Sequence, residues 1–310
     1  MLNASIILPT YNQRERLEFT LKTLQHQKYD KGDYEIVVIN DGSTDSTLQF
    51  LSAVEIKNLA VVNLVHNKGR AYARNQGIKA AKNDILIFSD SDRILPNNFI
   101  NSHVERLNNN CVSIGCIAEL FERDINQLFS DYKDNMPSFL KAVSRARLFN
   151  YYEFIMKIYD QEGLSTHPLC WCSLFSGNFC IHKSDIEKVG LFDESFAQWG
   201  FENFELGYRL FRQGFSFYLN REATNFHLYH ERNRMGEERE NSHIIFMNKY
   251  ADKGLKYLLR FLDGDISLEE FQKHMTGEKS DQYNSYFRKK KFGSKVYNLD
   301  DPNVLISLWR

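Results

Sequence analysis

Two carboxylates stand two residues apart at Asp90 and Asp92, directly after the apolar run at residues 84–89. Carboxylates at this spacing beyond a strand can converge on one hard divalent cation, and that cation can in turn hold a diphosphate. Short acidic pairs are also common in solvated surface turns. The motif alone therefore does not decide between a metal site and a turn.

A second group of residues has the chemistry of a phosphate site. Lys68 precedes Gly69, and Arg70 and Arg74 lie in the amphipathic stretch 69–82. The first turn of a helix exposes free N–H groups, and these suit a phosphate when Lys and Arg side chains stand beside them. A solvated basic helix start fits the same residues equally well. The glycine spacings of dinucleotide-binding and P-loop proteins are missing after the first apolar run, which argues against those classes and against a nucleotidyltransferase.

Histidines and glutamates further along the chain offer more chemistry. His227 or His230 could complete a metal site if it lay near the acidic pair, although a single histidine is more often structural. Glu202 and Glu205 begin another helical stretch, where Glu205 and Arg209 have the i, i+4 spacing of an ordinary exposed ion pair. Taken alone, each of these residues has a structural explanation.

The elements that would position these residues are predicted by alternation along the first 110 residues. Short apolar runs alternate there with amphipathic stretches, which is typical of βαβ units around a mostly parallel sheet. We expect strands at residues 5–9, 35–40, 59–65 and 84–89, and helices at 13–25, 45–53 and 69–82. Ligands bind at the carboxyl ends of the strands in open α/β sheets, and here those ends carry Thr10, Asn12, Asp41, Asn67, Asp90 and Asp92.

Beyond residue 110 the alternation fails. We expect a Phe-rich, charged and partly mobile helical stretch at 111–167, and then a strand at 173–181 that is broken at Gly177. A helix at 202–213 and a short strand at 215–219 should follow. The remainder is predicted to be a helical appendage with a basic run at 288–291.

Composition limits the possible functions. Lys and Arg total 39 and Asp and Glu total 40, so the net charge of −1 argues against a general electrostatic grip on nucleic acid or anionic membranes. No apolar run approaches the roughly 18 residues of a membrane helix, and no leader-like segment opens the chain. Five cysteines without framework spacing predict reduced thiols in a cytoplasmic protein.

Taken in order, these motifs resemble the family 2 glycosyltransferases of GT-A fold. In the first half the resemblance rests on IILPTYN at 6–12, VINDGSTD at 38–45, NKG and ARN within 67–75, and DSD at 90–92. Later motifs resemble the acceptor half shared by galactosyltransferases, chondroitin-type polymerases and polypeptide N-acetylgalactosaminyltransferases: GN at 177–178, GLFDE at 190–194, WGFENFE at 199–205, and His230. The resemblance implies a Rossmann-like α/β domain, with a mostly parallel sheet and helices on both faces.

The resemblance also divides the chain into three parts. Residues 1–110 would be the nucleotide-sugar-binding half and residues 111–236 the acceptor-binding half of one GT-A domain. Residues 237–310 would form a helical C-terminal extension.

A nucleotide pocket is implied at the strand ends of the first half. Its lining residues would be Pro9, Thr10, Tyr11 and Asn12. Asp41 would meet the uracil or the ribose, and the pyrophosphate would face Lys68, Arg70 or Arg74.

A metal site is implied beside that pocket. Asp92 would ligate Mn²⁺ or Mg²⁺, and His230 would be a further protein ligand because it matches the last histidine of this segment in the family. His227 is not chosen for that reason. Asp90 would touch the ribose or the metal, and Ser91 would lie with it against the nucleotide sugar.

The catalytic residues are implied to be Glu202 and Asn203, above a floor formed by Trp199 and Gly200. Inverting relatives carry Asp at the position of Asn203, where it is the general base, and Asn cannot accept that proton. Polypeptide N-acetylgalactosaminyltransferases carry Glu-Asn as well and retain the anomeric configuration. Glu202 could therefore be the base of an inverting enzyme, the reaction could be retaining without a protein base, or the activity could be lost. We favour the first interpretation because the amino-terminal half resembles inverting members.

The sequence thus predicts a metal-dependent hexosyltransferase of polysaccharide biosynthesis that moves a sugar from a UDP-sugar to a hydroxyl of a glycan or peptide. The alternatives are a retaining transferase and a non-catalytic carbohydrate-binding protein on a decayed transferase fold. We expect no nucleic-acid partner and no transmembrane segment, although the basic run at 288–291 could meet a membrane surface. The donor sugar, the acceptor and the oligomeric state are not predicted.

Overall fold

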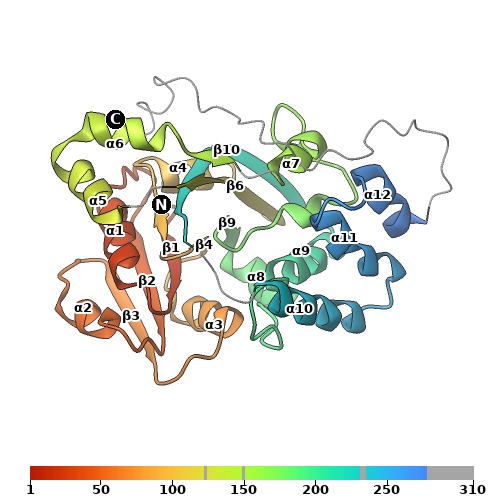
Figure 1. Cartoon of the computed structure of the whole chain (residues 1–310), viewed down its shortest axis with the longest axis horizontal. Coiled ribbons are helices and arrows are strands. Elements are labelled where there is room, and N and C mark those ends of the chain that lie inside the picture. Colours follow the sequence, from red (N-terminus) through yellow and green to blue (C-terminus); the bar gives the residue numbers. More distant parts are fainter. Residues whose placement is uncertain (122–123, 149–150, 231–234, 278–310) are drawn as a thin grey trace.

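The computed structural model of the chain describes residues 1–121, 124–148, 151–230 and 235–277. Within these residues the strands join one ten-stranded sheet with helices against both faces (Figure 1). The sheet has the order β3-β2-β1-β4-β9-β6-β10-β5, and two short strands, β7 (Arg147–Leu148) and β8 (Leu164–Ser165), pair with β6 and β10. The basic run at 288–291 lies outside the described residues.

The predicted alternation of the first half is confirmed. Strand β1 (Ala4–Thr10) pairs in parallel with β2 (Tyr34–Asp41) and β4 (Ile85–Ser89), and β2 pairs in parallel with β3 (Leu59–Leu64). The connecting helices are α1 (Arg14–Leu24), α2 (Thr47–Ala53) and α3 (Arg70–Ala80). Because the strands are parallel, their carboxyl ends meet at one edge of the sheet.

Alternate side chains of these strands pack against different helices. In β1, Ile7 belongs to a hydrophobic cluster that includes Ile78 of α3, whereas Ile6 and Leu8 belong to a cluster formed with α1 and α4 (Phe99–Glu105). Successive side chains of a strand point to opposite faces, so both faces of the sheet are buried.

The stretch 111–167 does not begin with the helix that the sequence indicated. Its first residues form strand β6 (Cys111–Leu120), which lies between β9 (Asn178–His182) and β10 (Ser216–Leu228). Both faces of β6 are buried, and its side chains therefore lack the apolar–polar alternation that would identify a half-exposed strand. The expected helices appear only afterwards, as α5 (Ile125–Asp134), α6 (Met136–Val143) and α7 (Tyr152–Ile158).

Two other strands have different bounds from those expected. The strand predicted at 173–181 is only β9, because Cys170–Ser173 forms a 3-10 turn and the extended segment begins after Gly177. The strand predicted at 215–219 continues to Leu228 in β10, across a β-bulge that the sequence pattern does not reveal. Helix α8 (Lys183–Val189) follows β9, and the helix predicted at 202–213 is α9 (Glu202–Arg212).

The C-terminal helices lie together on the side of the molecule away from α2 (Figure 1). They are α10 (Met235–Lys249), the 3-10 turn η2 (Lys253–Tyr257), α11 (Leu258–Leu262) and α12 (Leu268–Thr276). Phe246 of α10 and Phe271 of α12 are buried in the same hydrophobic cluster as Tyr208 of α9. Among the residues described, no helix has the length and apolar character needed to cross a membrane.

Candidate functional site

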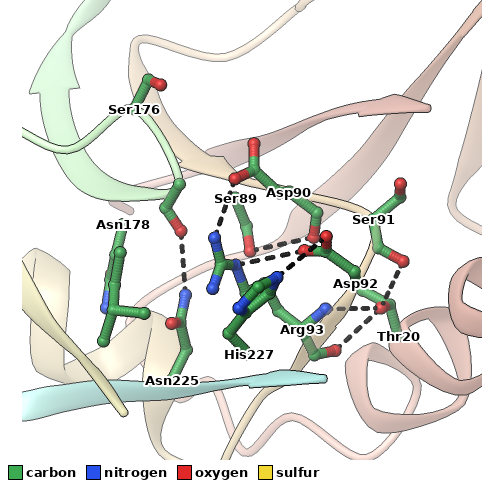
Figure 2. A network of polar contacts seen from close by, with 12 residues as sticks. Thr20, Ser89, Asp90, Ser91, Asp92, Arg93, Ser176, Asn178, Asn225 and His227 are labelled. Atoms are coloured by element: carbon green, nitrogen blue, oxygen red, sulfur yellow. Dashed lines mark hydrogen bonds and ion pairs between the residues drawn. The ribbon is translucent and has the colours of Figure 1, made fainter. Parts of the chain in front are cut away.

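Polar side chains from several elements converge where β4 ends (Figure 2). Residues 90–93 make the turn from β4 into β5 (Arg93–Ile94), and Thr20 of α1 holds this turn from behind. The Thr20 hydroxyl lies 2.9 Å from the Ser91 carbonyl oxygen and 2.7 Å from that of Arg93, and it accepts a hydrogen bond from the Arg93 amide. Ser91 and Asp92 are buried. The acidic motif is therefore not a solvated surface turn.

Asp92 meets both histidines of the later segment. Its Oδ2 lies 3.2 Å from Nε2 of His227 and 3.2 Å from Nε2 of His230. One ligand atom from each residue lies within 4.8 Å of the others, so the three can face one ion. One carboxylate oxygen and two imidazole nitrogens suit Mn²⁺ better than Mg²⁺, which prefers oxygen ligands. The sequence singled out His230 and set His227 aside, whereas the structure brings both histidines to Asp92.

The charges around this group stabilise its ionised forms. Burial would raise the pKa of Asp92, but His227 and Arg93 outweigh burial and hold that pKa well below its usual range. Burial and Arg93 oppose a charged His227, yet the carboxylates of Asp92 and Glu119 prevail and raise its pKa.

The bulge in β10 determines that the side chain of His227 points toward Asp92. The pairing of β10 with β6 shifts register between Asn220 and Asn225, and after the shift His227 lies opposite Glu119. Asn178 supports the bulge, because its Nδ2 donates to the carbonyl oxygens of Cys116 and Ala223 at 2.7 and 2.8 Å. Bulges commonly redirect side chains next to functional sites, and this one does so for His227.

Asp90 has different partners from Asp92. Its Oδ1 accepts from Arg74 and its Oδ2 from Arg93, each at 2.9 Å, as Figure 2 shows for Arg93. Burial would raise the pKa of Asp90, but the two arginines outweigh it and lower the pKa. The Asp92–His227–His230 group does not include Asp90.

Arg74 links Asp90 to Glu202. This arginine is fully buried, and its Nη1 donates to Oε1 of Glu202 at 3.1 Å. Ser176 also reaches Oε1, at 3.4 Å, while Oε2 of Glu202 is buried and has no hydrogen-bond partner within the part of the chain described. The two oxygens of the Glu202 carboxylate therefore differ, since only Oε1 has hydrogen-bond partners among the described residues.

The neighbours of Glu202 fix where α9 begins. Gly200 and Phe201 both have positive φ, at 97° and 67°, so the backbone turns sharply just before Glu202. Trp199 is half-buried, and its carbonyl accepts from Ser242 of α10 at 3.3 Å. The side chain of Asn203 has a structural contact instead, because its Nδ2 donates a hydrogen bond to the Leu174 carbonyl oxygen at 2.6 Å.

The residues expected around a nucleotide gather at the ends of β1 and β2. Asn12 binds the backbone of Thr44 through its Oδ1 at 2.7 Å, which ties the loop after β1 to the loop after β2. Asp41 accepts from the backbone amides of Lys68 and Gly69 at 2.8 and 3.0 Å, so it orders the start of α3. Burial raises the pKa of Asp41 despite these two hydrogen bonds.

Other expected nucleotide contacts differ in exposure. Pro9 is half-buried and Thr10 is buried, with a hydroxyl that has no partner in the described structure. Three side chains are exposed and free to meet a ligand at this edge: Tyr11, Lys68 and Arg70. Arg74 is not among them, since Asp90 and Glu202 occupy its terminal nitrogens.

Several residues of the site were not singled out from the sequence. Arg93 directly follows the acidic pair and opens the two-residue strand β5, which the sequence pattern did not indicate. Glu119 could not be found in this way because β6 itself was not predicted. Ser176 carries no motif of its own and only precedes the Gly177-Asn178 pair that the resemblance included.

An α/β sheet of this order, with a buried acidic turn, two histidines and a cationic helix start at its carboxyl edge, has the GT-A fold of solved glycosyltransferases. The chain belongs to glycosyl transferase family 2, whose model matches residues 5–168. A model described as the N-terminal domain of galactosyltransferase matches residues 165–231. The resemblance noted from the sequence motifs is thereby confirmed.

Individual relatives extend this similarity along the chain. The uncharacterized glycosyltransferase YfnE of Bacillus subtilis (strain 168) is 29% identical over 278 residues, covering 80% of this chain and 71% of YfnE. The chondroitin synthase of Pasteurella multocida (strain Pm70) is 32% identical over 231 residues. That match covers 69% of this chain but only 23% of the synthase, so this chain spans about a quarter of it.

A solved structure supports the fold. The crystal structure of GalNAc-T7 with UDP, GalNAc and Mn²⁺ superimposes with a TM-score of 0.61 over 88% of this chain and 54% of that one, at 17% identity. The expected α/β fold of GT-A type is confirmed.

Proposed function

We propose that this glycosyltransferase moves a hexose-type sugar from a UDP-sugar to a hydroxyl of a glycan or peptide, with a divalent cation held by Asp92, His227 and His230. The observation that carries the proposal is the convergence of these three side chains, with Oδ2 of Asp92 3.2 Å from both Nε2 atoms. The donor set favours Mn²⁺ over Mg²⁺. The UDP and Mn²⁺ in the GalNAc-T7 structure agree with this chemistry.

The donor would bind along the carboxyl edge of β1, β2 and β4. The exposed Lys68 and Arg70 stand at the start of α3, where free N–H groups and side-chain charge favour the diphosphate. Asp41 holds that start in place through the amides of Lys68 and Gly69. Pro9, Thr10, Tyr11 and Asn12 would line the uridine side.

Charge on the departing UDP is the main obstacle to transfer, and a bound cation at Asp92 would neutralise it. Arg74 and Arg93 hold Asp90 between them, which keeps the turn at 90–93 rigid next to that charge. We propose that Asp90 and Ser91 meet the donor sugar or ribose, and that Trp199 and Gly200 form the floor of the acceptor site.

Glu202 would take the proton of the acceptor hydroxyl. Arg74 fixes its Oε1, and its unpartnered Oε2 is left for the hydroxyl. A base on the face opposite the leaving UDP gives inversion at the anomeric carbon. We propose an inverting transferase on this ground, with Asn203 placing α9 through its bond to Leu174.

We propose that successive parts of the chain have different roles. Residues 1–110 would bind the donor, residues 111–236 would bind the acceptor and supply the base, and the part beyond 236 would support them.

A screen of UDP-sugars for slow hydrolysis tests the proposal without knowledge of the acceptor. One UDP-sugar should release UDP in the presence of Mn²⁺, and chelation of the metal should stop the release. Sugar binding without UDP binding or hydrolysis would instead support a carbohydrate-binding protein on a transferase fold.

A further inference from the structure

Glu119 stands directly behind His227, away from Asp92. It lies near the end of β6, opposite His227 in the parallel pairing of β6 with β10. Oε2 of Glu119 is 2.6 Å from Nδ1 of His227, which is shorter than the 3.2 Å between Asp92 and Nε2 of the same ring. The side chains are 18% and 6% exposed, so water competes little for this hydrogen bond.

The hydrogen bond has a defined direction. An ionised carboxylate only accepts, so Nδ1 of His227 carries the proton and donates it to Glu119. Nε2 faces the Asp92 carboxylate in the same way, so without a cation both nitrogens can carry a proton. A cation bound at Nε2 would take the place of that proton and leave the proton on Nδ1 with Glu119. Rotation of the ring would break the contact with Glu119 and turn Nε2 away from Asp92.

His230 reaches Asp92 from just beyond the end of β10. Its Nε2 also lies 3.2 Å from Asp92, but it follows the end of β10 and is more exposed, at 16% of its side chain against 6% for His227. Glu119 thus acts on one histidine of the pair, the one that the bulge in β10 brings to the site.

We propose that Glu119 is a positioning residue that fixes the ring of His227 with Nε2 directed at the cation site. This inference rests on the proposed metal site and assigns to β6 a part in metal affinity. Carboxylates that hold a ligating histidine in this way typically change metal affinity by about 10–100-fold when removed.

The test compares Mn²⁺ affinity of the full chain in wild type, Glu119→Gln and Glu119→Ala, by electron paramagnetic resonance of free Mn²⁺ without any sugar nucleotide. Glu119→Gln retains an oxygen acceptor for Nδ1–H, so we expect a loss of about tenfold. Glu119→Ala removes the acceptor and should lose closer to a hundredfold. Glu187→Gln, an exposed glutamate on α8, is the matched control and should bind as wild type does.

A second readout separates positioning from general damage. The Mn²⁺ concentration for half-maximal UDP release should rise in Glu119→Gln, while the rate at saturating Mn²⁺ and the urea midpoint of unfolding stay close to wild type. Equal Mn²⁺ affinity in wild type and Glu119→Gln would overturn the role of Glu119 and leave the metal site intact. Failure of wild type to bind Mn²⁺ would overturn the metal site and this role together.

Discussion

Arg74 is a buried arginine whose terminal nitrogens bind two different carboxylates. Nη2 reaches Asp90 and Nη1 reaches Glu202, at 2.9 and 3.1 Å. The planar guanidinium can span two acceptors at fixed angles, which a lysine ammonium cannot do. The side chain therefore sets the distance between the acidic turn after β4 and the start of α9.

Arg74→Ala should lower the free energy of unfolding by about 3 kcal/mol, because it leaves the buried Glu202 carboxylate without its counter-charge while Asp90 keeps Arg93. Arg74→Lys should keep the charge but lose one of the two contacts. Its free energy of unfolding should therefore lie between those of wild type and Arg74→Ala. Urea unfolding measures both. Arg70→Ala, at an exposed position of the same helix, should change the free energy by less than about 0.5 kcal/mol. Equal effects at 70 and 74 would contradict the bridging role of Arg74.

Glu202→Gln should lower the rate of transfer by about a hundredfold or more, since an amide cannot accept the acceptor proton. The affinity for UDP with Mn²⁺ should stay unchanged because Glu202 does not belong to the metal group. Steady-state kinetics and calorimetry measure the two effects, and NMR of the product anomer reports inversion. Normal turnover of Glu202→Gln, or a retained anomer, would support transfer without a protein base.

Some residues of the candidate site could be predicted from the sequence and others could not. Asp92 and His230 could be predicted because each belongs to a motif, and the structure brings them together. His227 was set aside because only His230 matches the last histidine of the family segment. The motif does not reveal that the register shift between Asn220 and Asn225 brings His227 to Asp92 as well. Arg74 was expected at a phosphate because it lies in a basic helix start. Its burial against Asp90 and Glu202 could not be predicted, because these partners lie 16 and 128 residues away in the sequence.

At the scale of elements, α10 supports the segment that carries Glu202. Phe201 has a φ of 67°, a conformation that a bulky residue holds only when its surroundings impose it. Its ring lies 5.1 Å from that of His243 and 6.3 Å from that of Phe246, both on α10. Lys249 of α10 also binds Asp193, at the other end of the same loop, at 2.5 Å.

Phe246→Leu should therefore slow transfer as well as weaken the fold. The smaller side chain loosens the contact with Phe201, and misplacement of a reacting group is costly, so we expect about a tenfold lower kcat. Phe271→Leu is the matched control, since Phe271 is equally buried in the same cluster but stacks on Phe261 of α11. Both variants should lose a similar part of the unfolding free energy, about 1 kcal/mol. An equal loss of kcat in the two would show that α10 acts only through stability.

The predictability of the elements follows from their exposure. Strands β1 to β4 could be predicted because amphipathic helices separate them and turn residues such as Gly42 follow them. β6 could not, because burial on both faces removes the period of two. The Cβ of any side chain at Gly115 would lie 2.1 Å from the Ala223 carbonyl oxygen, so this glycine serves strand packing and is not a turn signal.

At the scale of the whole molecule, His103 makes stability depend on pH. It is fully buried on α4, where its Nε2 donates to Oδ1 of Asn178 at 2.8 Å and its Nδ1 accepts from Ser113 at 3.2 Å. Burial lowers the pKa of His103 to about 4. The unfolded chain, with a histidine pKa of about 6.5, binds more protons between these values, so stability is present above pH 6.5 and is lost as the pH falls towards 4.

We expect this residue to lower the free energy of unfolding by about 2 kcal/mol between pH 6.5 and pH 5. His103→Gln can keep both hydrogen bonds without titrating, so this part of the pH dependence should disappear. Urea unfolding of both proteins at the two pH values measures it. An unchanged pH dependence in His103→Gln would contradict the assignment.

The net charge and the aromatic content of the chain can also be related to its structure. The net charge of −1 agrees with the proposal that Lys68 and Arg70, and not the surface as a whole, bind the phosphates. Most of the largest fully buried side chains are aromatic, among them Trp171, Tyr152 and Phe192, so the aromatic content mainly builds the core.

Asp92 and the two histidines are proposed to hold the cation through which the protein binds UDP. Calorimetric titration of UDP into wild type, Asp92→Asn and the exposed control Asp84→Asn, each with Mn²⁺ and with a chelator, tests this proposal most directly. Wild type and Asp84→Asn should bind UDP tightly only with Mn²⁺, and Asp92→Asn should lose the Mn²⁺-dependent part. Binding of UDP by Asp92→Asn with the Mn²⁺ dependence of wild type would contradict the account.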